Sequence, residues 1–437
     1  MKPIKVGLLG IGTVGTGTFH VLQRNQAEIR GRAGRGIEVS MVCRRDLAAA
    51  RAVVGDSDVV VTADPYAIIN NPEIDIVVET IGGCGLAREL VLAAIAQGKH
   101  VVTANKALLA VHGTEIFEAA RAKGVMVAFE AAVAGGIPII KALREGLSAN
   151  RIEWIAGIIN GTTNFILSEM KAKGLDFDVV LKEAQRLGYA EADPTFDIEG
   201  VDAAHKLTIM SAIAFGVPVQ FDKAHVEGIT ALQAADIRYA EQLGYRIKLL
   251  GLTRRRENGI ELRVHPTLVP TNRLIANVEG AMNAVLVQGD AVGTTLYYGK
   301  GAGAEPTASA IVADLVDVTR LATADPDHRV PHLAFQPDAM SNTPVLVMDD
   351  VITAYYLRLR VADQAGVLSR ITTILAEHDI SIDGMLQRES ADGEKQTDLI
   401  ILTHETVEGR MNKALAQMQA LPTVLAPIVR IRKEDLA

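Results

Sequence analysis

The sequence predicts an α/β protein with three folded parts: a doubly wound parallel sheet, an α+β domain and a small C-terminal β-α-β-β-α-β unit. The chain of 437 residues is too long for a single hydrophobic core, so two or three domains are expected. In the first third of the chain, short apolar runs alternate with helical patterns, which is typical of a parallel sheet with helices on its faces. A Pro-rich polar stretch, "ATADPDHRVPHLAFQPDAMSNTP" (322–344), then precedes the C-terminal unit.

Composition narrows the class of protein. The net charge is −8 and no basic cluster is present, which argues against a nucleic-acid partner. The two cysteines, Cys43 and Cys84, cannot form a disulfide scaffold and suit a reducing compartment. No apolar run reaches membrane-spanning length, and the N-terminus lacks the apolar core of a signal peptide. We therefore expect a cytoplasmic enzyme or sensor with no membrane or nucleic-acid partner.

A glycine-rich turn follows the first expected strand, "IKVGLLG" (4–10). Gly10, Gly12 and Gly15 match G-x-G-x-x-G, and Thr13 and Val14 lie between the last two glycines, at the start of a helix. The glycines allow a tight turn and close approach of a pyrophosphate to the free N–H groups of the helix. A turn that binds nothing is the alternative, but the flanking strand and helix favour a Rossmann-type dinucleotide-binding domain, which we place at residues 1–135.

The end of the second expected strand, "GIEVSMVC" (36–43), bears on the choice of dinucleotide. Arg44 and Arg45 follow it directly, and Asp46 comes one position later. An acid at this place usually holds the ribose 2′-OH of NAD, whereas a guanidinium pairs with the 2′-phosphate of NADP. The two arginines could also be solvated surface residues. We expect NADP(H) to be preferred, with NAD(H) possible.

Later strands in this domain end in polar residues. Because ligands bind at the carboxyl ends of strands in such sheets, four residues are expected at the crevice: Thr80, Asn105, Lys106 and Glu130. Cys84 lies in a glycine-rich loop with no histidine nearby in sequence, so we interpret it as a packing residue and not as a thiol nucleophile.

The stretch "GYAEADPTFDIEGVDAAHK" (188–206) carries five carboxylates and closes on a lysine before an apolar helix. Asp202 and Lys206 are spaced i, i+4 in a helix that is apolar nearly all round, so they are expected to be buried together. Such a pair is either a structural brace or part of a catalytic site. Carboxylates crowded around one lysine suit a small zwitterion, whereas a hard metal ion prefers carboxylates without a lysine among them. The pattern favours a substrate site.

Several separate blocks resemble the homoserine dehydrogenase family. They are the run from Gly188 to Pro194 with Asp197 to Asp202 and Lys206, "GIINGTTNFIL" (157–167), "GAGAEPTASA" (301–310) and "TANKALLA" (103–110). The resemblance covers about residues 1–330. It implies NAD(P)-linked interconversion of L-homoserine and L-aspartate 4-semialdehyde, a branch-point step toward threonine, methionine and isoleucine.

The resemblance also implies roles for residues. Lys206 would be the proton donor, Asp202 its partner, and Lys106 a second lysine at the reacting oxygen and the cofactor. The substrate would be held by Glu191, Asp197, Tyr189 and Thr162, and the nicotinamide side lined by Gly188 and Gly303. "EAAVAGGI" resembles the family's loop for a monovalent cation (Na⁺ or K⁺), with carbonyl ligands from Glu130, Val133, Gly135 and Ile137. The same loop could be a simple bend.

The remaining expectations concern domain organisation. Residues 136–330 would form the catalytic and dimerisation domain, and the helix after the glycine turn at 301–303 would return to the first domain. Residues 331–353 would be a flexible linker. Residues 354–437 resemble an ACT domain, whose turn from Asp363 to Gly366 would bind an amino-acid effector, most plausibly L-threonine. We therefore expect a feedback-inhibited homodimer or homotetramer whose last module is dispensable for hydride transfer; a plain dimerisation module is the alternative.

Two other functions remain open from the sequence. One is a dehydrogenase acting on a different amino-acid semialdehyde, and the other is a non-catalytic amino-acid sensor on an NADP-binding scaffold.

Overall fold

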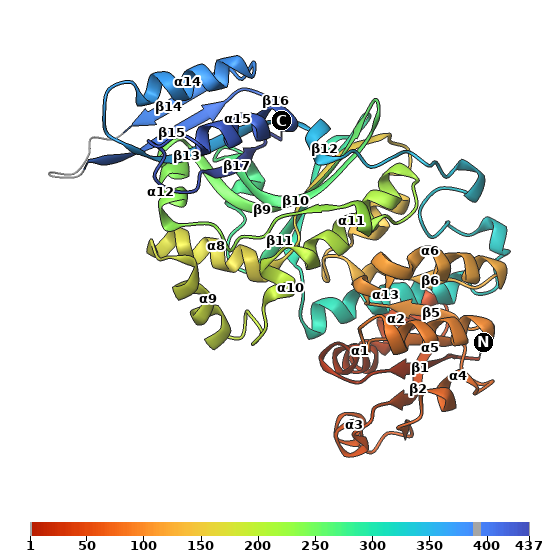
Figure 1. Ribbon diagram of the computed structural model, residues 1–437. Coiled ribbons are helices and arrows are strands. Elements are labelled where there is room, and N and C mark those ends of the chain that lie inside the picture. Colours follow the sequence, from red (N-terminus) through yellow and green to blue (C-terminus); the bar gives the residue numbers. More distant parts are fainter. Residues whose placement is uncertain (1, 388–394, 437) are drawn as a thin grey trace. The chain divides into compact units, whose positions relative to one another are not determined.

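The computed structural model describes residues 2–387 and 395–436, which form two compact units (Figure 1). Unit 1 consists of Met1–Gly161, Asp202–Ala224 and Ala281–Thr343, and unit 2 consists of Thr162–Val201, His225–Gly280 and Pro344–Ala437. Each unit is thus assembled from three stretches of chain. Across the described residues, no helix combines the length and apolar character needed to cross a membrane.

Unit 1 contains a six-stranded parallel sheet in the order β3-β2-β1-β4-β5-β6. Its strands are β1 (Ile4–Leu9), β2 (Ile37–Cys43), β3 (Val60–Thr62), β4 (Ile76–Glu79), β5 (His100–Thr103) and β6 (Val127–Ala128). Val6, Val77 and Val102 are fully buried, as expected for strands covered on both faces. The strand order reverses between β1 and β4, where sheets of this kind bind ligands. The predicted doubly wound parallel sheet is confirmed.

Two groups of helices accompany this sheet. The helices are α1 (Thr13–Arg24), α2 (Gln26–Ala33), α3 (Leu47–Val54), α4 (Pro65–Ile69), α5 (Gly85–Ala96), α6 (Lys106–Ala122) and α13 (Ala304–Leu321). Phe19 of α1, Ile29 of α2 and Leu315 of α13 belong to one hydrophobic core with β1 and β2. In the other group, α5 packs against α4 and α6. The helix that follows the second glycine turn, α13, therefore packs against the first strands of the chain.

The rest of unit 1 contains a second, antiparallel sheet and a buried helix. Its elements are η1 (Glu130–Ala132), α7 (Ile139–Lys141), η2 (Ala142–Gly146), β7 (Ile152–Ile158), α11 (Val201–Phe215), η3 (Phe221–Lys223), β11 (Met282–Gly289), β12 (Gly293–Lys300), η5 (Pro326–His328) and η6 (Pro337–Ala339). β11 pairs with both β7 and β12. Every residue of α11 from Asp202 onward is buried, so the expectation of a buried helix after the acidic stretch is met.

Unit 2 holds the acidic stretch and the C-terminal end of the chain. Its first elements are α8 (Gly161–Lys173), α9 (Phe177–Arg186), α10 (Thr195–Ile198), β8 (His225–Val226), α12 (Ala234–Gln242), β9 (Tyr245–Arg256), β10 (Gly259–Pro270) and η4 (Leu274–Asn277). β9 and β10 form a long antiparallel hairpin, and the short β8 pairs with β10 in parallel.

The C-terminal module, residues 352–436, follows η7 (Met348–Asp350). It comprises β13 (Ile352–Ala362), α14 (Val367–Glu377), β14 (Ile382–Gln387), β15 (Gln396–Thr403), β16 (Thr406–Val407), α15 (Glu408–Gln419) and β17 (Val429–Lys433). The strands lie in the order β17-β13-β15-β14, and side chains of both helices share a hydrophobic core with the sheet. Figure 1 labels these elements in blue at the C-terminal end of the chain. The predicted β-α-β-β-α-β unit is confirmed, with β16 as a short addition beside β13.

The sheet of the C-terminal module does not end at β17. Thr267 and Leu268 of β10 pair in parallel with Arg432 and Lys433 of β17. The backbone N–H of Glu434 also donates to the carbonyl oxygen of Leu268, at 3.0 Å. The module therefore continues the sheet of β9 and β10 within unit 2.

Residues 331–353, expected to be a flexible linker, are hydrogen-bonded to both units at several points, while many of their side chains are exposed. In unit 1, the Val127 N–H donates to His332 Nε2 at 3.1 Å, and the Ser341 N–H donates to the Gly216 carbonyl oxygen at 2.7 Å. In unit 2, the Ile260 N–H donates to the Pro344 carbonyl oxygen at 2.9 Å. Prolines favour an extended chain, and an extended chain can either bind to the units beside it or connect them loosely. The composition therefore did not distinguish a bound segment from a flexible linker.

Candidate active site

The glycine turn after β1 has the geometry of a phosphate-binding loop. Gly10 has a φ of +93°, and a Cβ atom on Gly15 would lie only 2.2 Å from the Gly10 carbonyl oxygen. Thr80, at the end of β4, donates its hydroxyl to the same carbonyl oxygen at 2.7 Å. Gly12 begins α1 and has no side chain with which to cap the first N–H groups. A dinucleotide pyrophosphate therefore fits here, because the turn is closed to side chains and the helix presents donors.

Arg44 lies directly over this turn. Its Nη1 donates to the carbonyl oxygen of Ile11 at 2.8 Å, while Arg45 is exposed. The acid that follows, Asp46, is the N-cap of α3, where Oδ1 accepts from the Ala49 N–H at 3.0 Å. The charged side chain at the glycine turn is thus the guanidinium of Arg44, whereas the carboxylate of Asp46 caps α3.

A cluster of three charged groups lies at the carboxyl end of β5 and on α11. Lys206 Nζ donates to Asp202 Oδ2 at 2.5 Å and to the Ile159 carbonyl oxygen at 2.7 Å. Lys106 Nζ lies 3.1 Å from Asp202 Oδ1, and Asn160 donates to Asp202 Oδ2 at 2.9 Å. Asp202 and Lys206 are 3% and 8% exposed, whereas the Lys106 side chain is 34% exposed. The structure brings the two predicted lysines together on one carboxylate.

The charge balance of this cluster determines what it can do. Burial alone would raise the pKa of Asp202, but the ion pairs with Lys206 and Lys106 outweigh it and hold that pKa well below its ordinary value. The carboxylate therefore stays ionised at neutral pH. Two ammonium groups share it, so the cluster keeps one net positive charge. Such a site can stabilise negative charge on a substrate oxygen and exchange a proton with it.

The expected substrate residues cluster within unit 2. The Thr162 hydroxyl donates to Asp197 Oδ2 at 3.0 Å and to the Tyr189 carbonyl oxygen at 2.8 Å. The Tyr189 ring stacks on Phe165 with centroids 4.1 Å apart. Glu191 is exposed on the same loop, and its backbone carbonyl oxygen accepts from Gln185 at 3.1 Å. Thr162, Tyr189 and Asp197 are therefore brought together, and Glu191 lies two residues from Tyr189 with its carboxylate exposed.

Three family models match the chain. One described as "Homoserine dehydrogenase" matches residues 138–316, one described as "Homoserine dehydrogenase, NAD binding domain" matches residues 10–130, and one described as "ACT domain" matches residues 355–423. The chain is 62% identical to the homoserine dehydrogenase of Pseudomonas aeruginosa over the whole of both proteins. The chain belongs to the homoserine dehydrogenase family.

Solved structures of other homoserine dehydrogenases agree with this assignment. One from Thiobacillus denitrificans is 68% identical, covers 100% of this chain and 99% of that chain, and gives a TM-score of 0.95. A hyperthermophilic archaeal homoserine dehydrogenase in complex with NADPH is 25% identical, covers 74% of this chain and 99% of that chain, and gives a TM-score of 0.63. The protein is thus an NAD(P)-binding oxidoreductase of amino-acid biosynthesis that carries an ACT domain.

The sequence analysis did not single out Asn160, although this residue belongs to the cluster around Asp202. It follows β7 closely and bonds to Asp202, while its neighbour Ile159 accepts from Lys206. A polar residue just after a buried strand was a usable signal, of the same kind that pointed to Lys106 after β5.

The expected cation loop is a strained turn packed against the second glycine turn. Ala134 and Gly135 have φ values of 55° and 45°, and a Cβ atom on Gly135 would lie 2.5 Å from the Gly301 carbonyl oxygen. The carbonyl oxygen of Ile137 accepts from the Ile139 N–H at 2.8 Å, and that of Glu130 accepts weakly from Val133 at 3.4 Å. Each carbonyl oxygen has two lone pairs, so these bonds leave room for a cation, and the donor set fits one.

Other predicted residues occupy turns. Gly303 has a φ of +126° and begins α13, and Gly188 has a φ of +78° after α9, so each adopts a conformation that favours glycine. Asp363 is exposed, and Gly366, with a φ of +88°, begins α14. Cys84 begins α5 and is partly buried.

Proposed function

We propose that the protein interconverts L-homoserine and L-aspartate 4-semialdehyde with NADP(H) as the preferred cofactor, and that Lys206 carries the proton. The observation that supports this most strongly is the carboxylate of Asp202 shared by Lys206 and Lys106. A family member needs a group that can protonate an aldehyde oxygen while hydride arrives, and a lysine at hydrogen-bond distance can do so.

The residues of this chain then have separate tasks. The nicotinamide, when bound, supplies or accepts the hydride at C4 of the substrate. In reduction, the Lys206 ammonium gives a proton to the aldehyde oxygen and becomes a neutral amine; in oxidation, the neutral amine takes the hydroxyl proton. Lys106 stabilises negative charge on the same oxygen, and Asp202 orients both ammonium groups. Asn160 and the Ile159 carbonyl oxygen fix Asp202 and Lys206 in place, so little reorganisation is needed during the reaction.

The substrate's amino-acid end requires complementary charge. We assign its ammonium group to the carboxylates of Asp197 and Glu191, with Thr162 and Tyr189 as further contacts. The bond from Thr162 to Asp197 supports this assignment because it orients one of these carboxylates. The chain itself links the two sets of residues, since only residues 198–201 separate Asp197 from Asp202.

Preference for NADP(H) is supported by the residues around the ribose position. Arg44 is bound to the glycine turn, and Asp46 is used as a helix cap. The hyperthermophilic archaeal relative was solved in complex with NADPH, which is consistent with the same preference in this chain. Gly188 and Gly303 are assigned to the nicotinamide side, and NAD(H) remains a possible second cofactor.

A monovalent cation, Na⁺ or K⁺, is assigned to the carbonyl oxygens of Glu130, Val133, Gly135 and Ile137. The positive φ of Ala134 supports this, because a residue other than glycine is held there in an unfavourable conformation that a bound cation would stabilise. The cation would order the loop that meets the glycine turn before α13.

The C-terminal module is assigned to feedback regulation by L-threonine, in a cytoplasmic homodimer or homotetramer of the threonine, methionine and isoleucine pathways. The exposed turn supports an amino-acid site, because Asp363 offers a carboxylate and Gly366 leaves the first N–H groups of α14 without a capping side chain. Asp363→Ala should relieve threonine inhibition and leave uninhibited activity unchanged. If calorimetry shows no binding of threonine, isoleucine or methionine, the module serves assembly alone.

The function is tested by following NADPH consumption by the purified protein with L-aspartate 4-semialdehyde, NADH and longer amino-acid semialdehydes serving as comparisons. Rapid turnover with the four-carbon substrate and NADPH supports the proposal. Preference for a longer semialdehyde would point to a related dehydrogenase, and complete lack of turnover would point to a sensor.

A further inference from the structure

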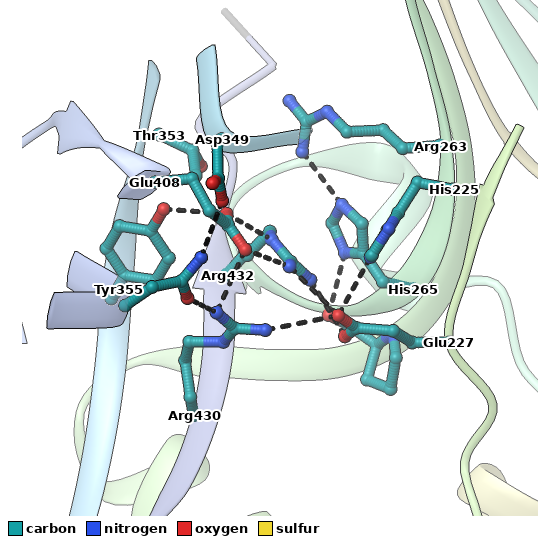
Figure 2. A network of polar contacts seen from close by, with 12 residues as sticks. His225, Glu227, Arg263, His265, Asp349, Thr353, Tyr355, Glu408, Arg430 and Arg432 are labelled. Atoms are coloured by element: carbon teal, nitrogen blue, oxygen red, sulfur yellow. Dashed lines mark hydrogen bonds and ion pairs between the residues drawn. The ribbon is translucent and has the colours of Figure 1, made fainter. Parts of the chain in front are cut away.

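A short segment of unit 2, residues 225–230, lies between the C-terminal module and α10. Its central carboxylate, Glu227, binds Arg432 of β17 through two parallel hydrogen bonds, from Nη1 to Oε2 at 2.8 Å and from Nη2 to Oε1 at 2.9 Å. Arg430 Nη2 and His225 Nε2 also contact Oε1, at 3.2 Å and 2.8 Å. Figure 2 shows these side chains converging on Glu227 from two strands. Bidentate pairs of this kind fix direction as well as distance.

Arg432 connects this carboxylate to the interior of the C-terminal module. Its Nε donates to Glu408 Oε2 at 2.8 Å, and the Tyr355 hydroxyl donates to the same oxygen at 2.8 Å. Glu408 is the first residue of α15, and Tyr355 lies in the core of the module on β13. Arg432 and Glu408 are each 1% exposed. Because Arg432 binds both Glu408 and Glu227, a movement of α15 relative to β17 is expected to change the position of the Glu227 carboxylate.

The other side of the segment touches α10. The Ile229 N–H donates to the Ile198 carbonyl oxygen at 2.9 Å, and the Thr230 hydroxyl donates to Glu199 Oε1 at 3.2 Å. A Cβ atom on Gly228 would lie 2.3 Å from the Ile198 carbonyl oxygen and 2.6 Å from the Glu199 Cα. The backbone of 228–229 is thus in direct contact with the residues that follow Asp197. Because the backbone at Gly228 already lies against Ile198 and Glu199, a displacement of the neighbouring Glu227 is expected to shift α10 as well.

We propose that Glu227 is a positioning residue through which the C-terminal module sets the place of Asp197, and with it the affinity for the amino-acid substrate. The inference rests on the proposed function, in which Asp197 holds the substrate. Every step lies within unit 2: Glu408 and Arg432 in the module, Glu227 and Gly228 in the segment, and Ile198 beside Asp197. An effector that moves α15 or β17 would displace Asp197 through these contacts and so change the KM for the substrate.

Unit 2 offers a matched control at the same boundary. Arg358 of β13 makes a similar two-point pair with Asp236 of α12, from Nε to Oδ1 at 2.6 Å and from Nη2 to Oδ2 at 3.1 Å. Asp236 is fully buried and also accepts from the Tyr356 hydroxyl at 3.2 Å. Both pairs join the module to the rest of unit 2, but only the pair of Glu227 lies in a segment bonded to α10.

The experiment compares Glu227→Gln, Gly228→Ala and Asp236→Asn in the full-length protein. Glu227→Gln should raise the KM for homoserine by about fivefold or more, the lower end of coupling between distinct sites, with kcat and the KM for NADP changed by less than about twofold. Gly228→Ala, which presses on α10 without removing any charge, should raise the same KM. Asp236→Asn should lower thermal stability and leave the KM for homoserine near the wild-type value.

Hydrogen exchange of the peptide covering 194–201 gives a readout that does not depend on turnover. Exchange should rise in Glu227→Gln and not in Asp236→Asn. The proposal is overturned if Glu227→Gln leaves both the KM and this exchange unchanged, or if Asp236→Asn changes them equally, which would indicate general loosening. A wild-type protein inactive on homoserine would instead refute the proposed function, and the exchange comparison would still decide whether Glu227 positions α10.

Discussion

Each unit contains a carboxylate shared by two cations, and the cations differ. Asp202 in unit 1 is shared by Lys206 and Lys106, and Glu227 in unit 2 is shared by Arg432 and Arg430. A lysine ammonium is a single charge on a flexible stem and can release its proton, whereas a guanidinium stays charged and presents a rigid fork. The lysine cluster is thus suited to reaction and the arginine cluster to holding two parts of unit 2 in register.

The largest expected effect comes from removing one side of the arginine cluster altogether. Truncation after residue 343 deletes β17, exposes the edge of β10 and takes Glu434 from Arg263, whose side chain is 1% exposed and donates to it at 2.6 Å. Arg263 would keep Glu261, whose Oε2 lies 2.8 Å from its Nη2, so the loss of Glu434 costs only part of the roughly 3–5 kcal/mol of a broken buried pair, and the exposed edge of β10 adds to it. We expect loss of soluble, folded protein, measured by yield and circular dichroism. This reverses the expectation from sequence, which treated the module as a tethered accessory.

A surface ion pair in the same module is the control for that truncation. Lys433 Nζ lies 2.6 Å from Asp383 Oδ2, and the two side chains are 16% and 36% exposed. Asp383→Asn should change stability by no more than about 1 kcal/mol. A soluble 1–343 protein that reduces the semialdehyde at the full-length rate would show that unit 2 does not need β17.

The second prediction concerns the lysine cluster. Lys206→Ala should lower kcat by about a hundredfold or more, because the group that exchanges the proton is lost, while NADP binding measured by fluorescence titration stays near normal. Lys99 is a matched control: it is buried at the opposite end of β5 and donates to two backbone carbonyl oxygens, at 2.7 Å each. Lys99→Ala should destabilise the protein and preserve kcat. Near-normal turnover in Lys206→Ala would leave the cluster with a structural role only.

The two clusters also differ in how far the sequence reveals them. Asp202 and Lys206 are four residues apart in one helix, so their spacing and the apolar residues around them predict a buried pair. Glu227 and Arg432 are 205 residues apart; Glu227 directly follows the two-residue strand β8, and Arg432 lies in β17. The parallel pairings of β10 with both β8 and β17 bring them together. Local chemistry was predictable because short-range periodicity encodes it, whereas long-range register was not.

Similar reasoning explains the other agreements and misses. The glycine turn was predictable because positive φ and close approach leave little choice of residue at Gly10 and Gly15. Residues 331–353 were expected to be flexible, and their hydrogen bonds were not predictable, because prolines mark extended chain without saying what that chain contacts. Asn160 was passed over because its partner, Asp202, lies 42 positions away.

The third prediction tests an arginine outside the unit 2 cluster. If Arg44 meets the 2′-phosphate, Arg44→Ala should weaken NADP binding by about 1.5–3 kcal/mol, roughly 10- to 150-fold, and NAD binding much less. Arg45 is exposed and makes a matched control. Arg45→Ala should have a smaller effect on the ratio of the NADP and NAD dissociation constants. Dissociation constants for both cofactors provide the measurement. Equal losses for NADP and NAD would show that Arg44 only supports the glycine turn through Ile11.

The smallest expected effect is the pH dependence of the arginine cluster. Burial would raise the pKa of Glu227, but hydrogen bonds from His225 and Arg432 outweigh it and hold the pKa well below its ordinary value of 4.5. The same balance, between burial and bonds from Arg432, lowers the pKa of Glu408. A depressed carboxyl pKa contributes stability that is present above the unfolded value and is lost as pH falls through the folded one.

Calorimetry of the wild-type protein should therefore show an unfolding temperature for unit 2 that is steady from about pH 8 to about 5 and falls in more acidic solution. Glu227→Gln should lower that temperature at about pH 7 by the equivalent of about 1 kcal/mol, a value discounted because the side chain is 32% exposed. The variant should also lose part of the acid-dependent decrease, since one titrating group is gone. An unchanged acid profile would mean that Glu227 is no better stabilised in the folded protein than in water, and the arginine cluster would then act through Glu408 alone.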